Sequence, residues 1–576
     1  MILQALTQYY DALNARGEID APGWGRPKIS YALHLRENGE LAQVIPLLHE
    51  AEAGKKKVLR PREDIRLPAA VKRTANPKSN FLWDNTAYLL GIDGKGKPDL
   101  TAKCFATAVL LHHELLDDVD SPFSHAVLAF FDTWQPAEAA QHPALVNDYD
   151  KIISGANLVF YVNGQYPADD PAICAAWQAH YDGDSDAPKQ QCLVTGELDE
   201  IAAVHPAIKG VRDAQSSGAA LVSFNAPAFC SYGHEQNYNA PVGKHAAFAY
   251  TTALNHLLAD REHAQYIGDT TVVCWAETAE PQYTDFFSCL MGNNTQSWSD
   301  NDLSAALQHL ADSEPCQELN LDPERAFYIL GLAPNAARLS VRFFYKNTFG
   351  ELMKNVNAHY ERLKIKRPAK APTGFLPLWQ LLAETVNQSA RDKKPSPVMA
   401  GATARAVWNN DRYPAALLNG VMLRIRADSE INWRRAAIIK AYYLKNEDEN
   451  CPKEVLTVSL NESSTSIPYA LGRLFSVYEA VQQAANPGIN ATIKDKYFNS
   501  ASSIPATIFP ILDKLCQKHL RKLRIDQQIY FNKQIGQIMD ILHEEYPARL
   551  SLPQQGSFDL GYYHQTQKRY TKKEDK

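Results

Sequence analysis

Apolar and polar positions change their spacing along the chain, and this change separates a mixed N-terminal half from a helical C-terminal half. Short apolar runs of strand length occur at 158–162, 220–224, 271–277 and 327–332. Apolar residues at helical spacing occur at 1–20, 102–118 and 242–260. Strands and helices mixed in this order indicate an α+β fold.

The clearest strand pattern is RLSVRFFYK at 338–346. A period of two assigns one face to Leu339, Val341, Phe343 and Tyr345 and the other to the cations Arg338, Arg342 and Lys346. We expect the apolar face to meet the core and the cations to form a stripe that contacts nucleic acid. A charged strand at the edge of a sheet, protected against pairing with another chain, has the same pattern.

After residue 347 the spacing becomes helical in one segment after another, and the polar tract NEDENCPK at 446–453 marks a boundary. We therefore predict an α+β N-terminal domain at 1–346, a basic helical region at 347–452 and a C-terminal helical bundle at 453–565. The last residues, 566–576, are polar and charged and are predicted to be a disordered tail.

The composition limits the class of protein. Of 576 residues, 45% are hydrophobic, which is enough for a sizeable core and excludes a wholly disordered chain. No uninterrupted apolar run is long enough to span a membrane. The nine cysteines are scattered without a CxxC pair, which is typical of cytosolic proteins. We expect a cytoplasmic protein with no membrane partner.

The net charge of -6 is the sum of very different regions. Residues 104–320 hold 6 bases and 29 acids, a net charge of -23, whereas residues 321–440 hold 20 bases and 9 acids, a net charge of +11. Residues 55–103 are also basic, with 12 bases and 5 acids. Basic blocks on an acidic protein suggest contact with a polyanion at defined places. Solvated lysines without a partner are the alternative.

The sequence offers two weak candidates for a metal site. His113 and Asp117 lie one helical turn apart, and Cys174, His180 and Cys192 form a second set. The first lacks the HExxH arrangement, and the second matches no common zinc spacing. Walker, GxGxxG and GxSxG motifs are missing from the sequence. We therefore expect no catalytic residue, no metal and no cofactor.

Two polar segments contain the residue types that contact nucleic acids. The loop SFNAPAFCSYGHEQNYNAPVGKHAAF at 223–248 holds four amides that are candidates for reading base edges, Asn225, Gln236, Asn237 and Asn239. The stretch KRTANPKSNFLWDN at 72–85 adds Lys78 and Asn80 as base contacts and Lys72 and Arg73 as phosphate contacts. Amides that cap turns, and a loop pinned by Trp83, are the structural alternatives.

Two further groups of cations are expected to guide a nucleic-acid backbone or a displaced strand. The first group, on predicted helices, is Arg424, Arg426, Arg434 and Arg435. The second, within two turns of the predicted bundle, is Lys518, Arg521, Lys522 and Arg524. Clustered cations of this kind follow the phosphates of a single strand.

Several long segments carry a family resemblance. They are MILQALTQYYDAL, NFLWDNTAYLLGID, CLVTGE with HPAIKGV, AQSSGAALVSFNAPAFCSYGHEQNYNAPVGKHAAFAYTTALNHLL, FYILGLAPNAARLSVRFFYK and NATIKDKYFNSASSIPATIFP. With these segments the chain resembles the large subunit of the type I-C CRISPR surveillance complex (Cascade), a CRISPR-associated protein of the Csd family. The resemblance runs almost from end to end.

The resemblance implies a non-enzymatic role in antiviral defence. The family's large subunit recognises the protospacer-adjacent motif in double-stranded DNA, helps to open the duplex into an R-loop and recruits a helicase–nuclease that cuts. The implied partners are the CRISPR guide RNA, the target DNA, the helicase–nuclease and the backbone, handle-binding and small subunits of Cascade. Sequence reading is otherwise left to pairing between guide and target. The resemblance also implies that the C-terminal bundle is similar to the small subunit.

Two other functions remain open at this point. A stand-alone nuclease requires a metal site, for which the region of His113 and Asp117 is the candidate. A scaffold that holds RNA and partner subunits without reading DNA predicts target binding that does not depend on the adjacent motif.

Overall fold

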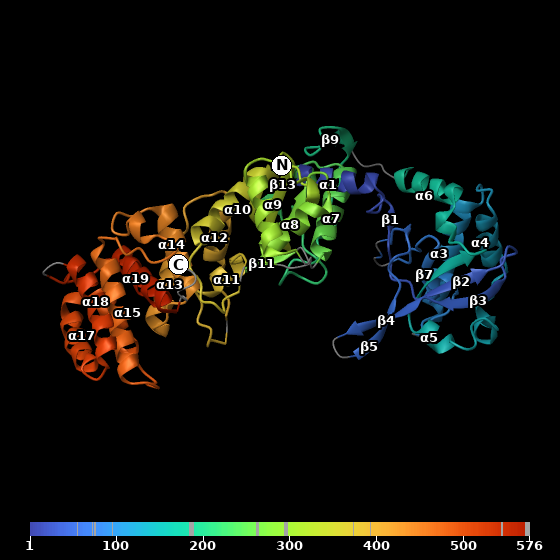
Figure 1. Cartoon of the computed structure of the whole chain (residues 1–576). Coiled ribbons are helices and arrows are strands. Elements are labelled where there is room, and N and C mark those ends of the chain that lie inside the picture. The colour runs from blue at the N-terminus through green and yellow to red at the C-terminus, as the bar shows by residue number, and fades with distance from the viewer. Residues whose placement is uncertain are drawn as a thin grey trace. The chain divides into compact units, whose positions relative to one another are not determined.

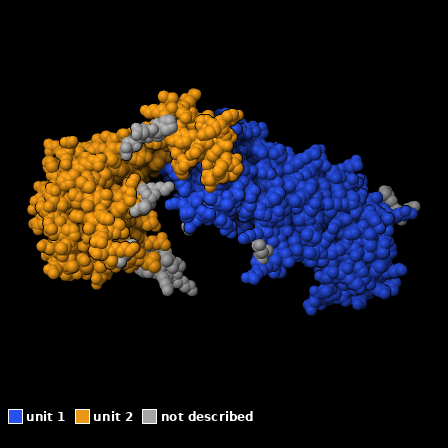
Figure 2. Space-filling view, turned by 180° about the vertical axis from the view of Figure 1, so that it is seen from behind, with its two compact units in different colours: residues 1–9, 206–223, 251–576 blue, residues 10–205, 224–250 orange. Residues whose placement is uncertain are grey.

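Figure 1 shows the computed structural model of the chain. It describes all residues except 54–55, 72, 74–75, 95, 184–188, 261–263, 293–297, 373, 392, 543–544 and 571–576, and it describes no side chains within 51–57. The chain forms two compact units, which Figure 2 colours separately. Unit 1 comprises residues 1–9, 206–223 and 251–576, and unit 2 comprises residues 10–205 and 224–250.

The boundaries predicted at 346 and 452 both fall inside unit 1. One apolar core continues across them, because residues before 346, between 346 and 452, and after 452 pack into the same cluster. For example, the rings of Phe343 and Trp408 lie 5.3 Å apart between centroids.

The main sheet of unit 2 has the strand order β3-β2-β8-β7, in which β2 and β8 run parallel. The strands are β2 (Tyr31–Leu35), β3 (Leu41–Pro46), β7 (Trp83–Asn85) and β8 (Asn157–Val162). The apolar run of β8 is buried because α4 (Pro122–Thr133) covers it. Phe130 and Phe131 of this helix each place their ring centroid 5.5 Å from that of Phe160.

His112, a buried residue of α3 (Pro98–Leu116), links this helix to the backbone beside β7. Its Nδ1–H donates to the carbonyl of Ala108 (2.7 Å), and its Nε2 accepts from the backbone N–H of Leu82 (2.9 Å). Complete burial lowers the pKa of His112 to about 4, so the ring is neutral at physiological pH.

The described part of the first 205 residues also contains other helices and three two-stranded sheets. The helices are α1 (Ile2–Ala15), α2 (Thr86–Leu89), α5 (Tyr149–Ile153) and α6 (Pro171–Gly183). The two-stranded sheets pair β1 (Trp24–Gly25) with β6 (Leu67–Pro68), β4 (Leu48–Ala53) with β5 (Lys56–Pro61), and β9 (Lys189–Gln191) with β10 (Leu198–Glu200). Helix α7 (Lys244–Ala259) follows later in the chain.

Unit 1 is built on an antiparallel sheet of order β11-β12-β13-β14. The strands are β11 (Gln265–Ile267), β12 (Thr270–Ala276), β13 (Ala326–Asn335) and β14 (Arg338–Thr348). All seven residues of β12 are buried. Phe327 of β13 meets Phe287 of α8 (Pro281–Leu290) and Phe349 of α10 (Phe349–Leu363). Helix α9 (Asp300–Ala311) packs beside α10.

After α10 the regular elements of unit 1 are helices, as Figure 1 shows for the orange and red part of the chain. The helices are α11 (Leu378–Ala383), α12 (Pro397–Trp408), α13 (Ala415–Asp428), α14 (Trp433–Asn446), α15 (Ile467–Ala485), α16 (Ile493–Ser503), α17 (Pro505–Leu520), α18 (Ile525–Leu542) and α19 (Leu552–Tyr570). Helices α15 and α19 cross in direct backbone contact at two glycines. A Cβ at Gly472 would overlap the carbonyl of Phe558, and a Cβ at Gly561 would overlap that of Tyr469.

The predicted α+β class is confirmed, with mixed sheets in the first part of the chain and helices in the last. Two predicted segments are wrong. The run at 220–224 forms no strand, only an isolated bridge from Ala220 to Arg338. Residues 566–570 of the predicted disordered tail belong to α19, because their helix is anchored on α15; residues 571–576 lie outside the described part.

Candidate nucleic-acid interface

The amide-rich loop of unit 2, residues 224–243, has a fixed and unusual backbone. It contains two 3-10 turns, η3 (Pro227–Phe229) and η4 (Gln236–Asn239). Tyr232 and Gln236 have positive φ angles of 54° and 49°. Residues with a side chain adopt this left-handed conformation only where surrounding contacts impose it.

Asn239 supplies those contacts. Its Oδ1 accepts from the backbone N–H of Ser231 (2.7 Å), and its Nδ2 donates to the carbonyls of His234 (3.1 Å) and Gln236 (2.9 Å). Both amide donors are therefore used inside the loop. In this conformation Asn239 organises the loop and has no free donor for a base edge, which corrects the prediction that it reads bases.

Asn237 is also turned inward, with only 3% of its surface exposed. Its backbone N–H donates to the carbonyl of Ala203 (3.2 Å), and its Oδ1 is buried without a partner among the described residues. Burial against this neighbouring segment removes the Asn237 side chain from the loop's surface, so the prediction that it reads bases is corrected as well.

The outer surface of the loop carries the other two amides and two aromatic side chains. Asn225 and Gln236 are exposed. Tyr232 is 99% exposed and Phe229 is 44% exposed. Sequence reasoning gave the aromatics no role. The sequence does contain a signal that Tyr232 is exposed: it directly precedes Gly233 in a polar loop, where a large side chain has no apolar neighbours to pack against.

In the segment 72–85, the side chains of two of the four predicted contact residues, Arg73 and Asn80, hold the loop itself. Arg73 pairs with the buried carboxylate of Asp84, donates from Nε to the carbonyl of Lys78 (2.8 Å) and lies 4.1 Å above the ring of Tyr88. Burial raises the pKa of Asp84, against the effect of Arg73 and two backbone N–H groups. Lys72 lies outside the described residues, and Lys78 has an exposed side chain.

Asn80 is 3% exposed and structural. Its Oδ1 accepts from the backbone N–H of Val71 (2.9 Å), and its own N–H donates to Asp84 (2.8 Å). Trp83 donates from Nε1 to the carbonyl of Pro68 (2.8 Å). The alternative of a pinned loop is therefore the one observed, and the prediction that Asn80 reaches a groove is corrected by its burial.

Strand β14, which carries Arg338, Arg342 and Lys346, is an edge strand of its sheet. A β-bulge interrupts the alternation of its side chains between the two faces of the sheet. Gly331 pairs with Phe343 and Leu332 with Val341, so Arg342 is the extra residue. Val341 is consequently 39% exposed rather than buried as predicted. Bulges and charges both protect an edge from pairing with another chain, which favours the edge-strand alternative.

The three cations of this strand make contacts within the protein. Arg342 donates to Asp269 (3.0 Å) and remains 47% exposed. Lys346 is exposed, with its Nζ 5.8 Å above the ring of Tyr328. Arg338 is half-buried and bridges to Ala220 through its backbone. Arg342 and Lys346 thus present charge to solvent, whereas the predicted continuous stripe is broken by the bulge.

The first group of helical arginines forms an ion-pair network. Arg435 is buried, 4% exposed, and donates to Glu384 (3.1 Å) and Asp428 (2.5 Å). Arg424 pairs with Asp428, and Arg434 lies 3.5 Å from Glu384. Burial opposes ionisation of Asp428, but the arginine hydrogen bonds outweigh it and lower its pKa.

These contacts favour a structural role for Arg424 and Arg435 over the predicted guidance of nucleic acid, because carboxylates neutralise their charges inside the fold. Arg434 is 33% exposed, and its predicted role stays a prediction. Arg426 is exposed in part and donates to Gln555 (2.6 Å), so it ties α13 to α19.

The second group of cations lies on the surface where α17 ends and α18 begins. Lys518, Arg521, Lys522 and Arg524 are all exposed. Arg524 is 81% exposed and pairs with Asp526 (3.0 Å); Lys518 and Arg521 have no ion-pair partner among the described residues. Ile525, Ile529 and Tyr530 are also exposed on α18, at 76%, 65% and 57%. Cations beside exposed apolar and aromatic groups are typical of single-strand binding surfaces.

Neither candidate metal set is assembled for a metal. His113 is held by two carboxylates, with Nδ1 2.8 Å from Asp117 and Nε2 3.2 Å from Asp132. Cys192 accepts backbone hydrogen bonds from Gly243 and Val194, while Cys174 donates to the carbonyl of Ala168. In the described part of the chain, no group of three or more potential ligands has the arrangement of a metal site.

The comparison with known families decides the identity of the chain. Residues 6–570 match the family described as CRISPR-associated protein (Cas_Csd1). The chain belongs to this family. The resemblance found in the sequence is thereby confirmed, and this Csd1-family protein acts as a CRISPR-associated subunit together with other CRISPR-associated proteins and nucleic acids. No curated protein matches the chain. None of the helices in its described residues is long and apolar enough to cross a membrane.

Proposed function

We propose that this protein is the large, non-catalytic subunit of a type I-C Cascade that recognises the protospacer-adjacent motif in double-stranded DNA. The loop 224–243 carries the proposal, because it holds two exposed amides and an exposed tyrosine on a backbone fixed in left-handed conformations. A preorganised polar loop loses little conformational freedom when it binds.

The proposed readers of the motif are Asn225 and Gln236, with Lys78 as a further contact. Each bidentate contact between an amide and a base contributes about 1–3 kcal/mol of discrimination. Two such contacts suffice to prolong residence at the motif while still allowing release from other DNA. Asn239 acts on recognition indirectly by holding the backbone of Ser231 and Gln236 in place.

After motif binding, the proposed role is to open the duplex and stabilise the displaced strand in an R-loop. The exposed cations of the bundle suit this role: Lys518, Arg521, Lys522 and Arg524. The acidic region at 104–320 suits protein partners with basic surfaces, among which we include the helicase–nuclease. The guide RNA and the backbone, handle-binding and small subunits complete the proposed assembly, in the cytoplasm.

The test uses the assembled complex. Binding is measured to guide-matched duplexes that carry the correct or a scrambled adjacent motif, with wild type and the double variant Asn225→Ala, Gln236→Ala. We expect the variant to lose about 10-fold or more of its preference for the correct motif, with unchanged assembly. Gln4→Ala removes an exposed amide elsewhere and is the matched control.

Equal discrimination by wild type and double variant would show that the loop does not read the motif. A wild-type complex without any preference would favour the scaffold function over the reader function.

A further inference from the structure

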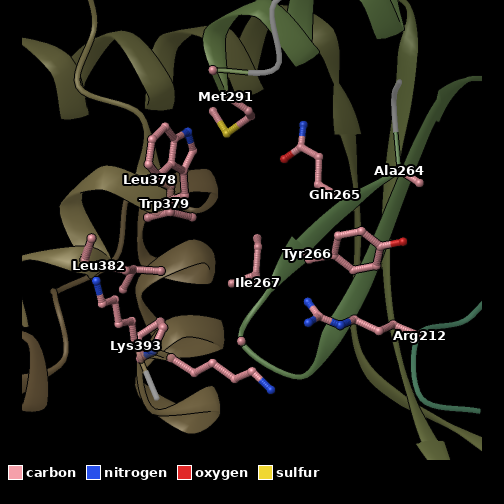
Figure 3. A pocket seen from close by; sticks show the side chains of 15 residues that line it. Arg212, Ala264, Gln265, Tyr266, Ile267, Met291, Leu378, Trp379, Leu382 and Lys393 are labelled. Atoms are coloured by element: carbon pink, nitrogen blue, oxygen red, sulfur yellow. The ribbon is translucent and has the colours of Figure 1, made fainter. Parts of the chain in front are cut away.

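A cavity of about 740 Å³ opens within unit 1, between strand β11 and helix α11. Figure 3 shows β11 on one side and, on the other, helix α11 with Leu378 and Trp379 and the irregular segment with Lys393. Its volume lies within the range of small-molecule sites and is ample for a nucleotide. None of the contacts proposed above for motif reading or strand guidance lines it.

Two half-exposed aromatic residues line this cavity. Trp379 is 55% exposed and Tyr266 is 50% exposed; Figure 3 shows Trp379 on the helical side and the Tyr266 ring on the far side of β11, directed away from Trp379. The guanidinium of Arg212 lies 5.2 Å from the centre of the Tyr266 ring, which extends the flat surface on that side. Large rings left half-open in a cavity are typical stacking platforms for bases.

The charge of the lining is positive. Arg212, Lys393 and Lys394 line the cavity, and none of the described residues that line it is a carboxylate. Arg212 has Asp213 at 3.9 Å but is 42% exposed, so its charge remains accessible. A cavity with aromatic lining residues and cations at its margin combines the two attractions that a nucleotide needs, stacking for the base and charge for the phosphate.

A buried amide without a partner points to the ligand's polar edge. Gln265 lines the cavity, and Figure 3 shows its side chain between Met291 and Tyr266. Its Nε2 is buried and has no hydrogen-bond acceptor among the described residues. An unsatisfied buried donor is unfavourable, and a carbonyl oxygen or ring nitrogen of a base would satisfy it.

We propose that this cavity binds an unpaired nucleobase of a single-stranded nucleic acid. The base stacks on Trp379, its edge accepts a hydrogen bond from Gln265, and the neighbouring phosphates lie near Arg212 and the two lysines. The inference extends the proposed function in strand handling and rests on it, since it places a base-binding site away in sequence from the motif-reading loop.

The test uses the purified full-length chain and fluorescently labelled single strands. The probes are oligothymidylate, oligouridylate and, for each, an abasic strand with the same number of phosphates. We expect Trp379→Ala to weaken binding of the base-bearing strands about 10-fold and to leave binding of the abasic strands unchanged. Trp379→Phe keeps a ring and should recover most of the affinity, and Gln265→Leu should weaken it about 5-fold.

Tyr570→Ala is the matched control, because Tyr570 is 68% exposed and also carries an arginine, Arg569, over its ring. Its affinities should equal those of the wild type. The thermal unfolding midpoint of each variant shows that folding is intact. Comparison of the thymidylate and uridylate arms identifies whether the occupant is DNA or RNA.

Equal losses for base-bearing and abasic strands, no loss in Trp379→Ala, or no binding by the wild type would each overturn the proposal. The motif-discrimination assay separates this result from the proposed function. Trp379→Ala should keep its preference for the correct motif, so a failure of the cavity leaves motif reading intact, and a failure of motif reading leaves the base-stacking result unaffected.

Discussion

Two groups of cations in unit 1 differ in what surrounds them. In the group at 424–435, Arg424, Arg434 and Arg435 lie against Asp428 or Glu384, and Arg435 is only 4% exposed. The group at 518–524 lies at a helix–helix turn in solvent, beside exposed Ile525 and Tyr530. The first holds helices together and the second is available to a polyanion. A cluster of cations indicates a nucleic-acid surface only where carboxylates of the same protein do not already neutralise the cations in buried ion pairs.

The largest expected effect is on the buried network. Arg435→Ala leaves Glu384 and Asp428 without their buried partner and should lower the free energy of unfolding by about 3–5 kcal/mol. Chemical denaturation of the full chain measures it. Arg521→Ala, which removes an exposed arginine from the other group, should change the free energy of unfolding by less than about 0.5 kcal/mol. Similar losses in both variants would remove the distinction between the groups.

A smaller effect is expected when the stability of the buried ion-pair network is measured at different pH values. The pKa of Asp428 is lower in the folded protein than in the unfolded chain, because the arginine hydrogen bonds outweigh burial. Its stabilising contribution is therefore complete above the unfolded pKa of about 4 and is lost as the pH falls through the folded value. We expect the difference in stability between wild type and Arg435→Ala to narrow below about pH 4.

Denaturation of both proteins across the acid range measures this narrowing. A difference that stays constant down to the lowest pH at which both remain folded would contradict an ionised Asp428 as the partner.

The smallest effect on stability is expected for the exposed group. A triple variant, with Lys518→Ala, Arg521→Ala and Arg524→Ala in one chain, should have the same unfolding midpoint as the wild type. Binding to single strands should weaken evenly across sequences, and the slope of log affinity against log salt should fall by up to about three units. An unchanged salt slope would show that phosphates do not bind there.

The sequence predicted those parts of the fold whose own residues decide them. The apolar runs of β8, β12 and β13 and the apolar face of α15 specify their elements locally. The predicted bundle included α19 as far as residue 565, but residues 566–570 were assigned to a disordered tail because they are polar and charged. The helix continues through them because α19 is in close contact with α15, which the sequence does not show. The bulge at Arg342 depends on pairing with β13, which no pattern within β14 reveals.

The candidate site was predictable as segments but not as individual contacts. The loop predicted at 223–248 was identified from its amides. Which of these amides face outward depends on contacts with Ser231, His234 and Ala203, whose positions cannot be predicted from the sequence. Likewise, Arg435 donates a hydrogen bond to Glu384, which lies 51 residues away in the sequence, so the pattern around Arg435 does not reveal this partner. Tyr266 and Trp379 form one cavity although they lie on distant segments of the chain.

The interleaving of the two units has a consequence for biosynthesis. Unit 2 is complete once residue 250 has been synthesised. At that point unit 1 consists only of residues 1–9 and 206–223, and it cannot fold until residues 251–576 have been synthesised. Domains that are finished early fold while the ribosome is still translating. The loop 224–243, which we propose as the motif reader, therefore belongs to the unit that can fold first. The first residues of α1 can pack into unit 1 only after the sheet of that unit has been synthesised.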